Sequence, residues 1–173
     1  MAPLELPLLP ESVDLTMRPA TAEDHEHCAE IYLEARARAV ADNTMPVGIH
    51  PDAEVRQWMR DVVLPGREVW LASAADDSAV GLLVLDRAWL DSLYVRPAWW
   101  GRGVASALLT LAKALRPDGF SLWVFEVNAP ARRLYERHGL SLARRTDGSD
   151  NEEGAPDLEY VWRPGGDMSL VSK

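Results

Sequence analysis

The chain has 173 residues, of which 47% are apolar, and a net charge of −9 at pH 7, which predicts one globular domain with a substantial core. An acidic chain without a run of five or more Lys and Arg argues against nucleic acid as a partner, and no apolar run reaches the roughly 18 residues that span a bilayer. A single cysteine, Cys28, a start without the basic region of a signal peptide and the lack of zinc-like Cys and His spacing favour a cytoplasmic protein without a metal.

The first part of the chain predicts a leader, a strand and two helices. Thr21 is a candidate N-cap because acidic residues follow it in the first turn, and apolar residues then recur at helical spacing. Pro46 and Gly48 interrupt that pattern, and Pro65-Gly66 is expected to stop the second helix. We expect a loose leader at residues 1–13, a strand at 15–18, a helix from 21 to about 40, a loop at 41–50 and a helix at 52–63.

The rest of the chain alternates strands and helices, which predicts a mixed α/β domain with one main sheet. Apolar residues at 104, 108, 111 and 115 form a stripe that faces a core, and Gly139 suits a left-handed helix cap. We expect strands at 68–73 and 80–85 joined as a hairpin, a strand at 89–95, a helix at 104–115, a strand at 120–127, a helix at 129–138, strands at 140–145 and 158–163 around an acidic loop at 146–157, and a frayed tail at 164–173.

The turn between strand 89–95 and helix 104–115 carries Gly101 and Gly103. Two glycines let backbone N–H groups approach a ligand, and a helix N-terminus attracts anions, so this turn is a candidate phosphate site. The first turn also carries Arg102 and no acidic residue, which favours an anion there. A plain strand-to-helix connection explains the same residues equally well. The missing third glycine excludes a dinucleotide fingerprint, and the missing Gly-Lys-Ser/Thr excludes a P-loop.

Three segments together resemble the GNAT family (GCN5-related N-acetyltransferases). The run from Leu93 to Leu109 (LYVRPAWWGRGVASALL) is similar to that family's acetyl-CoA-binding motif, and Asn128 to Leu140 (NAPARRLYERHGL) is similar to its next motif. The opening from Met17 to Asp24 (MRPATAED) is a common start for such domains. The resemblance covers residues 14–163. It implies a mostly antiparallel sheet of about six to seven strands, split near strands 89–95 and 120–127, with about four flanking helices.

The resemblance also implies how acetyl-CoA binds. Backbone amides of the turn would hold the pyrophosphate, with Gly103 and Ala105 at the small positions of the signature. Trp100 stands where the family usually has Arg or Gln, so side-chain help would come from Arg102 or Arg96. The strand before the turn would bind the pantetheine arm through its backbone. The implied acetyl-CoA-binding residues are Leu93, Tyr94, Val95, Trp100, Gly101, Arg102, Gly103, Val104, Ala105, Ser106, Asn128, Arg132 and Tyr135.

Two residues are candidates for proton transfer when an amine attacks the thioester directly. Tyr135 matches the family tyrosine near the CoA sulfur, where a phenol can protonate the leaving thiolate; the alternative is an aromatic residue at the edge of the core. Asp91 is expected to share a strand face with Leu93 and Val95 and to act as the general base. The alternative for Asp91 is a carboxylate that pairs with an arginine.

The family builds its acceptor site from the first two helices and their loop. The candidate residues here are Tyr32, Glu34, Met45 and His50, opposite the acidic loop at 146–157. That loop suggests a small primary amine with a further positive charge, although a solvated hairpin loop explains it as well. The resemblance leaves two further functions open: a non-catalytic acyl-CoA sensor and an acetyltransferase for protein N-termini or lysines. Such domains often pair, so a homodimer is an expectation for the assembled state.

Overall fold

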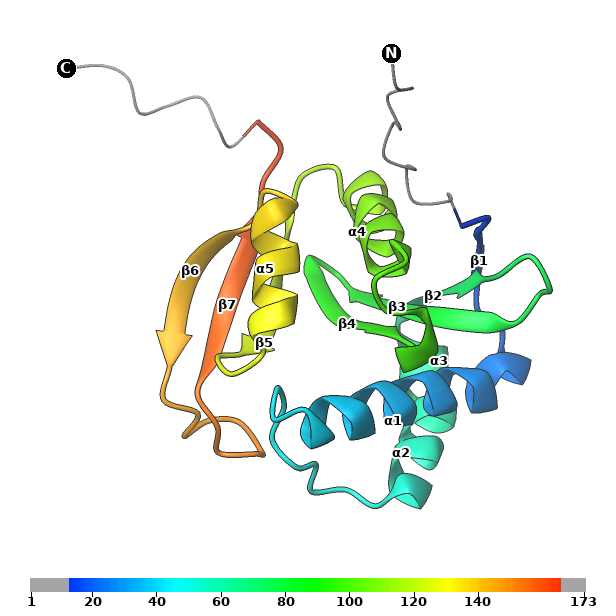
Figure 1. Ribbon diagram of the computed structural model, residues 1–173, viewed down its shortest axis with the longest axis horizontal. Helices are drawn as coiled ribbons and strands as arrows, with labels where there is room; N and C mark the ends of the chain where they lie inside the picture. The colour runs from blue at the N-terminus through cyan, green and yellow to red at the C-terminus, as the bar shows by residue number, and fades with distance from the viewer. Residues whose placement is uncertain (1–12, 166–173) are drawn as a thin grey trace, which may run out of the picture.

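The computed structural model describes residues 13–165, so the leader expected at residues 1–12 and the tail at 166–173 lie outside the described residues. Seven strands and the helices between them follow the order expected for an α/β domain (Figure 1). In chain order the elements are β1 (Thr16–Pro19), η1 (Ala22–Asp24), α1 (His25–Ala41), α2 (Asp52–Trp58), η2 (Met59–Val63), α3 (Leu64–Gly66), β2 (Glu68–Ser73), β3 (Ala79–Asp86), β4 (Trp89–Val95), η3 (Pro97–Trp99), α4 (Val104–Leu115), β5 (Phe120–Phe125), α5 (Ala129–Arg137), β6 (Ser141–Thr146) and β7 (Asp157–Trp162).

The strands form one sheet in the order β1-β2-β3-β4-β5-β7-β6. Every neighbouring pair is antiparallel except β4 and β5, which run parallel and pair only at Trp89 and Ser121. From that pair onward the two strands diverge, so the sheet opens into two arms (Figure 1). The predicted fold class, including the split between these two strands, is confirmed.

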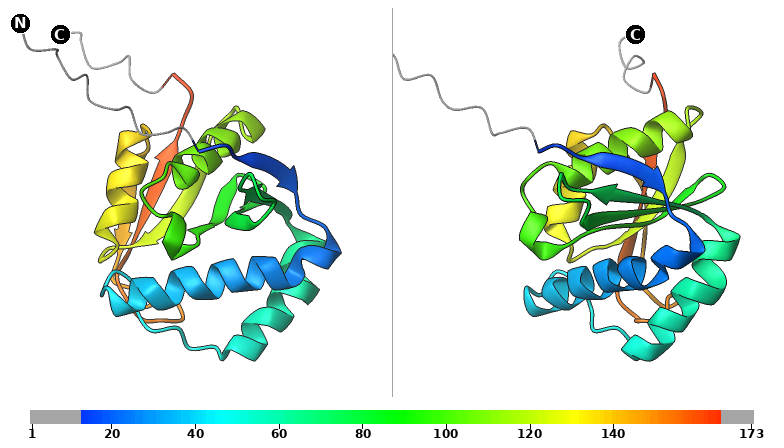
Figure 2. Two further views of the ribbon diagram at one scale, coloured as in Figure 1. Left: turned by 45° about the vertical axis from the view of Figure 1, so that its right-hand side comes forward. Right: turned by 90° about the vertical axis from the view of Figure 1, so that its right-hand side faces the viewer.

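Helices cover both faces of the sheet. Strand β3 is buried from Ala79 to Leu85, so its side chains are buried on both faces. Leu83 and Leu85 pack in the core under α4, whereas Leu82 and Val84 pack in the core under α1 and α2. Figure 2 shows α4 and α5 on one side of the sheet and α1 with α2 on the other. The cleft between the diverging strands therefore has a helix pair on each side.

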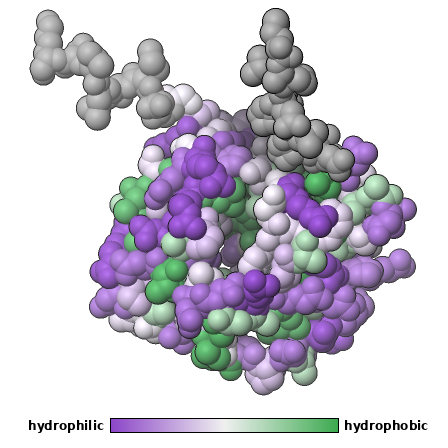
Figure 3. All heavy atoms as spheres, viewed as in Figure 1, coloured by the Kyte–Doolittle hydropathy of each residue, from purple (hydrophilic) through white to green (hydrophobic). Residues whose placement is uncertain are grey.

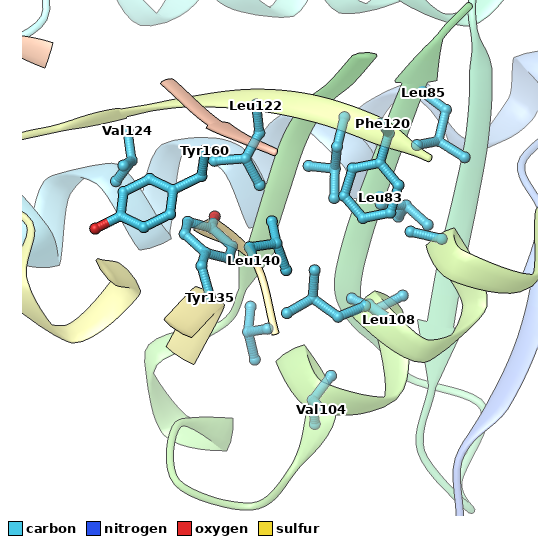
Figure 4. Packing of buried hydrophobic residues seen from close by; sticks show 14 of the residues in the cluster. Leu83, Leu85, Val104, Leu108, Phe120, Leu122, Val124, Tyr135, Leu140 and Tyr160 are labelled. Atoms are coloured by element: carbon cyan, nitrogen blue, oxygen red, sulfur yellow. The ribbon is translucent and has the colours of Figure 1, made fainter. Parts of the chain in front are cut away.

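Close packing of α4 against β3 depends on Gly81. A Cβ atom at this position would lie 2.9 Å from side-chain atoms of both Val104 and Leu108. Val104 and Leu108 are themselves buried in the core that also contains Tyr135 and Tyr160 (Figure 4). The missing side chain lets α4 approach the sheet, which places the helix N-terminus beside the end of β4.

Two predicted boundaries differ from the structure by more than one residue. The second helix does not stop before Pro65 but continues to Gly66, because a wider π turn at Met59–Val63 precedes the proline, whose missing N–H is then tolerated. Strand β5 ends at Phe125, two residues earlier than predicted, since the N–H of Asn128 closes a turn onto the carbonyl of Phe125. Among residues 13–165 no helix has the length and apolarity to cross a membrane.

Candidate active site

A cleft of about 1130 Å³ lies where β4 and β5 diverge. Its wall includes the turn before α4 and the start of α5 on one side of the sheet, and α1 and α2 on the other. The space-filling view shows this face hollowed near its centre (Figure 3). The cleft is large enough for a ligand of cofactor size, and its two ends differ in chemistry.

The turn before α4 offers backbone N–H groups as its main feature. Gly101 and Gly103 adopt φ angles of +74° and +83°, and a Cβ atom at either position would have no neighbour within 4 Å. Within the described chain, the amides of residues 101–106 have no hydrogen-bond acceptor. Of these six residues, all but Arg102 line the cleft, and unpaired donors at a helix N-terminus fit the pyrophosphate of a coenzyme A molecule.

The Trp100 side chain makes contacts with the protein itself. Its indole Nε1 donates a hydrogen bond to the carbonyl oxygen of Val95 at 2.7 Å, and the guanidinium of Arg38 lies over its ring at 5.7 Å. The side chain therefore fixes the turn against the end of β4. The backbone amide cradle does not depend on which side chain occupies this position.

The two arginines expected to assist the phosphates do not point into the cleft. Arg102 lies over the ring of Trp99 at 4.9 Å and is not on the cleft wall. Arg96 donates to the carbonyl of Ala79 at 2.7 Å and forms ion pairs with the carboxylates of Glu34 and Glu30. These pairs hold Arg96 and Glu34 off the cleft wall, so the structure does not bring Arg96, Arg102 or Glu34 to the site.

Residues of α5 complete the wall beside the turn. The Asn128 side chain accepts a hydrogen bond from the Ala131 amide at 3.2 Å, which caps α5, and it also lines the cleft. Arg132 instead turns to the Tyr160 hydroxyl and the Glu126 carbonyl and lies off the wall. Arg137, which the sequence did not single out, is on the wall and has no ion-pair partner in residues 13–165.

Tyr135 places a phenol at the centre of the cleft. The residue is 7% exposed, and its ring centroid lies 6.1 Å from that of Tyr160 (Figure 4). No fully buried side-chain oxygen of the described chain lacks a hydrogen bond, and the Tyr135 hydroxyl has none, so it must open onto the cleft. Burial raises the pKa of Tyr135, and the nearby Tyr94 adds a smaller increase. The phenol therefore keeps its proton at neutral pH and can donate it.

Asp91 lies on the other side of the sheet from Leu93 and Val95, contrary to the sequence-based expectation. Val84 pairs with Ser92 and Leu85 with Leu90, which leaves Asp91 as the extra residue of a β-bulge. The bulge breaks the alternation of side chains along β4. Leu93 and Val95 pack toward α4, whereas the Asp91 carboxylate forms an ion pair with Arg67.

The environment of Asp91 sets its charge. The guanidinium of Arg67 lies over the ring of Trp58 at 5.6 Å, which holds the ion pair at the α2 side of the cleft. Burial raises the pKa of Asp91, and the charge of Arg67 opposes that increase. A carboxylate with a raised pKa is a stronger proton acceptor than an exposed one.

The end of the cleft under α1 contains a cluster of polar side chains around Arg36. Its Nη1 lies 3.5 Å from the Tyr32 hydroxyl and 3.4 Å from the Tyr94 hydroxyl, and its Nη2 lies 3.1 Å from the Glu153 carboxylate. The side chains of Arg36 and Glu153 are only 15% and 16% exposed. Burial raises the pKa of Tyr32 to about 12 and also raises the pKa of Tyr94. Both phenols are therefore neutral donors at physiological pH.

The acidic loop between β6 and β7 closes this end of the cleft. Glu153 pairs with Arg36, and the neighbouring Glu152 contacts His50 Nε2 at 3.1 Å. His50 Nδ1 contacts Glu54 at 3.0 Å, and these two carboxylates raise the pKa of His50. Glu153 and Glu152 therefore already have partners in Arg36 and His50, so two of the five carboxylates of the loop at 146–157 are not free.

The structure brings most of the predicted residues together but not all. Glu34, His50, Arg102 and Arg132 have no place on the cleft wall. A basic residue one helical turn after Tyr32, on the side of α1 that faces the core, is the sequence signal that could have identified Arg36. No group of three or more His, Cys, Asp or Glu in residues 13–165 is arranged to hold a metal ion. The predicted residues on the wall are Tyr32, Met45, Asp91, Leu93, Tyr94, Val95, Trp100, Gly101, Gly103, Val104, Ala105, Ser106, Asn128 and Tyr135.

Comparisons with known proteins agree with this arrangement. A family model described as the acetyltransferase (GNAT) family matches residues 30–140. The chain is 28% identical over 110 residues to the peptidyl-lysine N-acetyltransferase YjaB of Salmonella typhimurium strain LT2, covering 64% of this chain and 74% of that protein. It is also 28% identical over 162 residues to the L-amino acid N-acetyltransferase AaaT of Escherichia coli strain K12, covering 86% and 93%. The solved structure of the PaiA N-acetyltransferase of Thermoplasma acidophilum in complex with coenzyme A has a TM-score of 0.65 at 19% identity, covering 87% of this chain and 99% of that one.

Proposed function

The chain belongs to the GNAT family of acetyltransferases and is an N-acetyltransferase, and we propose that it transfers the acetyl group of acetyl-CoA to a small-molecule amine by direct attack on the thioester. One observation carries this proposal. A cleft opened by the divergence of β4 and β5 is lined by a turn with unpaired amides and by the unpaired phenol of Tyr135. The structure of the PaiA protein with coenzyme A supports the same choice of acyl donor.

The residues of the turn bind and orient the donor. The amides of residues 101–106 would hold the pyrophosphate, and the exposed edge of β4 from Leu93 to Val95 would align the pantetheine arm with its backbone. Acetyl-CoA supplies an activated acyl thioester. Trp100 keeps the end of β4 and the turn in one fixed relation, because its indole is bonded to the Val95 carbonyl.

Two side chains of the cleft move protons in this proposal. Asp91 accepts a proton from the acceptor amine, which must be neutral to react, and its raised pKa suits that role. Tyr135 donates its phenolic proton to the sulfur that leaves, and its hydroxyl has no competing partner in the described chain. The two groups approach the reaction from opposite faces of the sheet, so each proton has its own route.

The closed acceptor end supports a small molecule over a protein substrate. Glu153, which lines the cleft, connects the loop between β6 and β7 to Arg36, so this loop forms a wall at the acceptor end. If a lysine of a protein were the acceptor, its side chain would have to enter the cleft while the protein backbone stayed outside this wall. A free small molecule meets no such restriction. The likeness to YjaB, whose name states peptidyl-lysine, makes lysine peptides the second candidate.

A binding assay followed by an activity assay tests this proposal. Acetyl-CoA and CoA should raise the melting temperature of the protein and ATP should not, because ligand binding to the native state stabilises it. Free thiol should then appear in the presence of small amines, and more slowly with lysine peptides. Binding of acetyl-CoA without thiol release on any amine would instead identify a non-catalytic acyl-CoA sensor.

A further inference from the structure

The polar cluster around Arg36 has donors that the protein itself does not use. Each of the Tyr32 and Tyr94 hydroxyl oxygens accepts a bond from Arg36 Nη1, but neither hydroxyl hydrogen has an acceptor in residues 13–165. Arg36 Nε also has no acceptor there. Unused donors in a largely buried site favour a ligand that brings hydrogen-bond acceptors.

The bonds that hold Arg36 are long, which leaves its guanidinium available. The two contacts to phenol oxygens measure 3.4 and 3.5 Å, at the outer limit for a hydrogen bond, and the contact to Glu153 measures 3.1 Å. A planar guanidinium with free N–H groups binds a carboxylate well. Glu153 fixes the orientation of Arg36 before the ligand arrives.

The charges around the acceptor end are already balanced in pairs. Arg36 is paired with Glu153 and Arg67 with Asp91, so each of these two cations already has a carboxylate beside it. A second amine on the acceptor would need a free carboxylate. Two wall carboxylates lack a cationic partner in the described chain: Asp150, which is exposed to solvent, and Asp157, which accepts hydrogen bonds from Thr146 and Asn151. A zwitterion adds no net charge. Its carboxylate can pair with Arg36, and its amine can lie near Asp91.

We propose that the acceptor is a small amino acid or a related amine that carries a carboxylate, with this carboxylate bound by Arg36, Tyr32 and Tyr94. The amine then lies toward Asp91 and β4, where the thioester would be attacked. This inference rests on the proposed N-acetyltransferase function and adds to it the chemical class of the acceptor. It also assigns Arg36 as the residue that determines specificity.

Matched substrates test the inference directly. A series of L-amino acids is compared with the corresponding carboxamides, which keep the amine and lose the charge of the carboxylate. The wild-type protein should acetylate each acid with a kcat/KM about 10- to 100-fold above that of its carboxamide, since a site built around a polar group rejects an analogue that lacks it. The amine of the carboxamide is less basic than that of the acid, so more of it is neutral and able to attack near neutral pH. Amine reactivity therefore cannot cause a preference for the acid.

Variants assign the preference to its residues. Arg36→Gln should remove the preference by raising KM for the acid far more than KM for the carboxamide, with the Kd of acetyl-CoA unchanged. The double variant Tyr32→Phe/Tyr94→Phe keeps the aromatic packing and should reduce the preference several-fold, which gives a second readout if Arg36→Gln does not fold. Arg60→Gln, which breaks an exposed ion pair with Asp61 outside the cleft, is the matched control.

The outcomes separate the two proposals. Equal kcat/KM for acids and carboxamides, or a preference that survives Arg36→Gln and the double tyrosine variant, would overturn this inference and leave the acetyltransferase function intact. A protein that binds no acetyl-CoA and acetylates no amine would overturn the proposed function and this inference together.

Discussion

The two ends of the cleft are built from different parts of the chain. At the proposed donor end the available groups are unpaired backbone amides of one continuous turn, residues 101–106, held by the glycine conformations at 101 and 103. At the acceptor end they are side chains from distant segments, among them Tyr32, Arg36 and Glu153. A site made of backbone tolerates changes of side chain, whereas a site made of side chains can change its ligand with one substitution.

The substitution at Trp100 illustrates the first half of this comparison. We expect a tryptophan in place of Arg or Gln to leave the proposed amide cradle in place, because the indole nitrogen already bonds to the Val95 carbonyl. At the acceptor end no comparable redundancy exists, since each donor of the cluster comes from a single side chain. We therefore expect donor-end variants to affect binding through backbone geometry and acceptor-end variants to affect specificity.

The largest effect is expected from Tyr135→Phe, which removes the phenol where the two ends meet. The variant should lower kcat about 100-fold or more, the usual effect of losing a general acid, and leave the Kd of acetyl-CoA unchanged. Steady-state kinetics and calorimetric titration measure the two quantities. Tyr160→Phe is the matched control, because its ring packs beside Tyr135 and its hydroxyl bonds to Glu136 outside the cleft. A kcat within about threefold of the wild type for Tyr135→Phe would remove this residue from the mechanism.

Gly103→Ala tests whether the donor end works through its backbone. A methyl group at φ +83° costs about 1–2 kcal/mol of stability and occupies the space where the phosphates would lie, so the Kd of acetyl-CoA should rise at least about 10-fold. Gly139→Ala is the matched control, because Gly139 has a φ of +80° with equally open space but does not line the cleft. Equal loss of binding in both variants would mean that stability, and not the cradle, caused the effect.

Asp91→Asn tests the acceptor end as a source of the base. Burial raises the pKa of Asp91, so the wild-type kcat/KM should fall as the pH drops through that raised pKa and the carboxylate becomes protonated. The variant should lose about 10-fold in kcat/KM and retain only the pH dependence of the acceptor amine itself. Profiles of kcat/KM against pH that coincide in shape for both proteins would show that water takes the proton.

Trp100→Phe should have the smallest effect of the four. The variant keeps an aromatic ring but loses the bond from the indole to the Val95 carbonyl, which costs about 0.5–1.5 kcal/mol of stability. Acetyl-CoA should bind no more than about threefold weaker, because the amides remain. A loss comparable to that of Gly103→Ala would mean that the tryptophan itself contacts the ligand.

The same contrast explains what could be predicted from the sequence. Apolar periodicity predicted the strands and helices, and the glycine turn and the segment from Asn128 predicted the donor end, because both are local in the chain. The bulge at Asp91 could not be predicted, since one extra residue reverses the side-chain alternation without any mark in the sequence. The ion pair between Arg36 and Glu153 joins residues 117 positions apart, so only the folded chain brings it together.

Amide hydrogen exchange of residues 101–106, with and without acetyl-CoA, tests the central claim most directly. These amides have no acceptor in the described chain, so they should exchange rapidly in the free protein and become protected when the ligand binds. The first turn of α5, whose Ala131 amide is already capped by Asn128, should change little. Acetyl-CoA that binds by calorimetry while residues 101–106 continue to exchange rapidly would contradict a donor site built from the backbone of this turn.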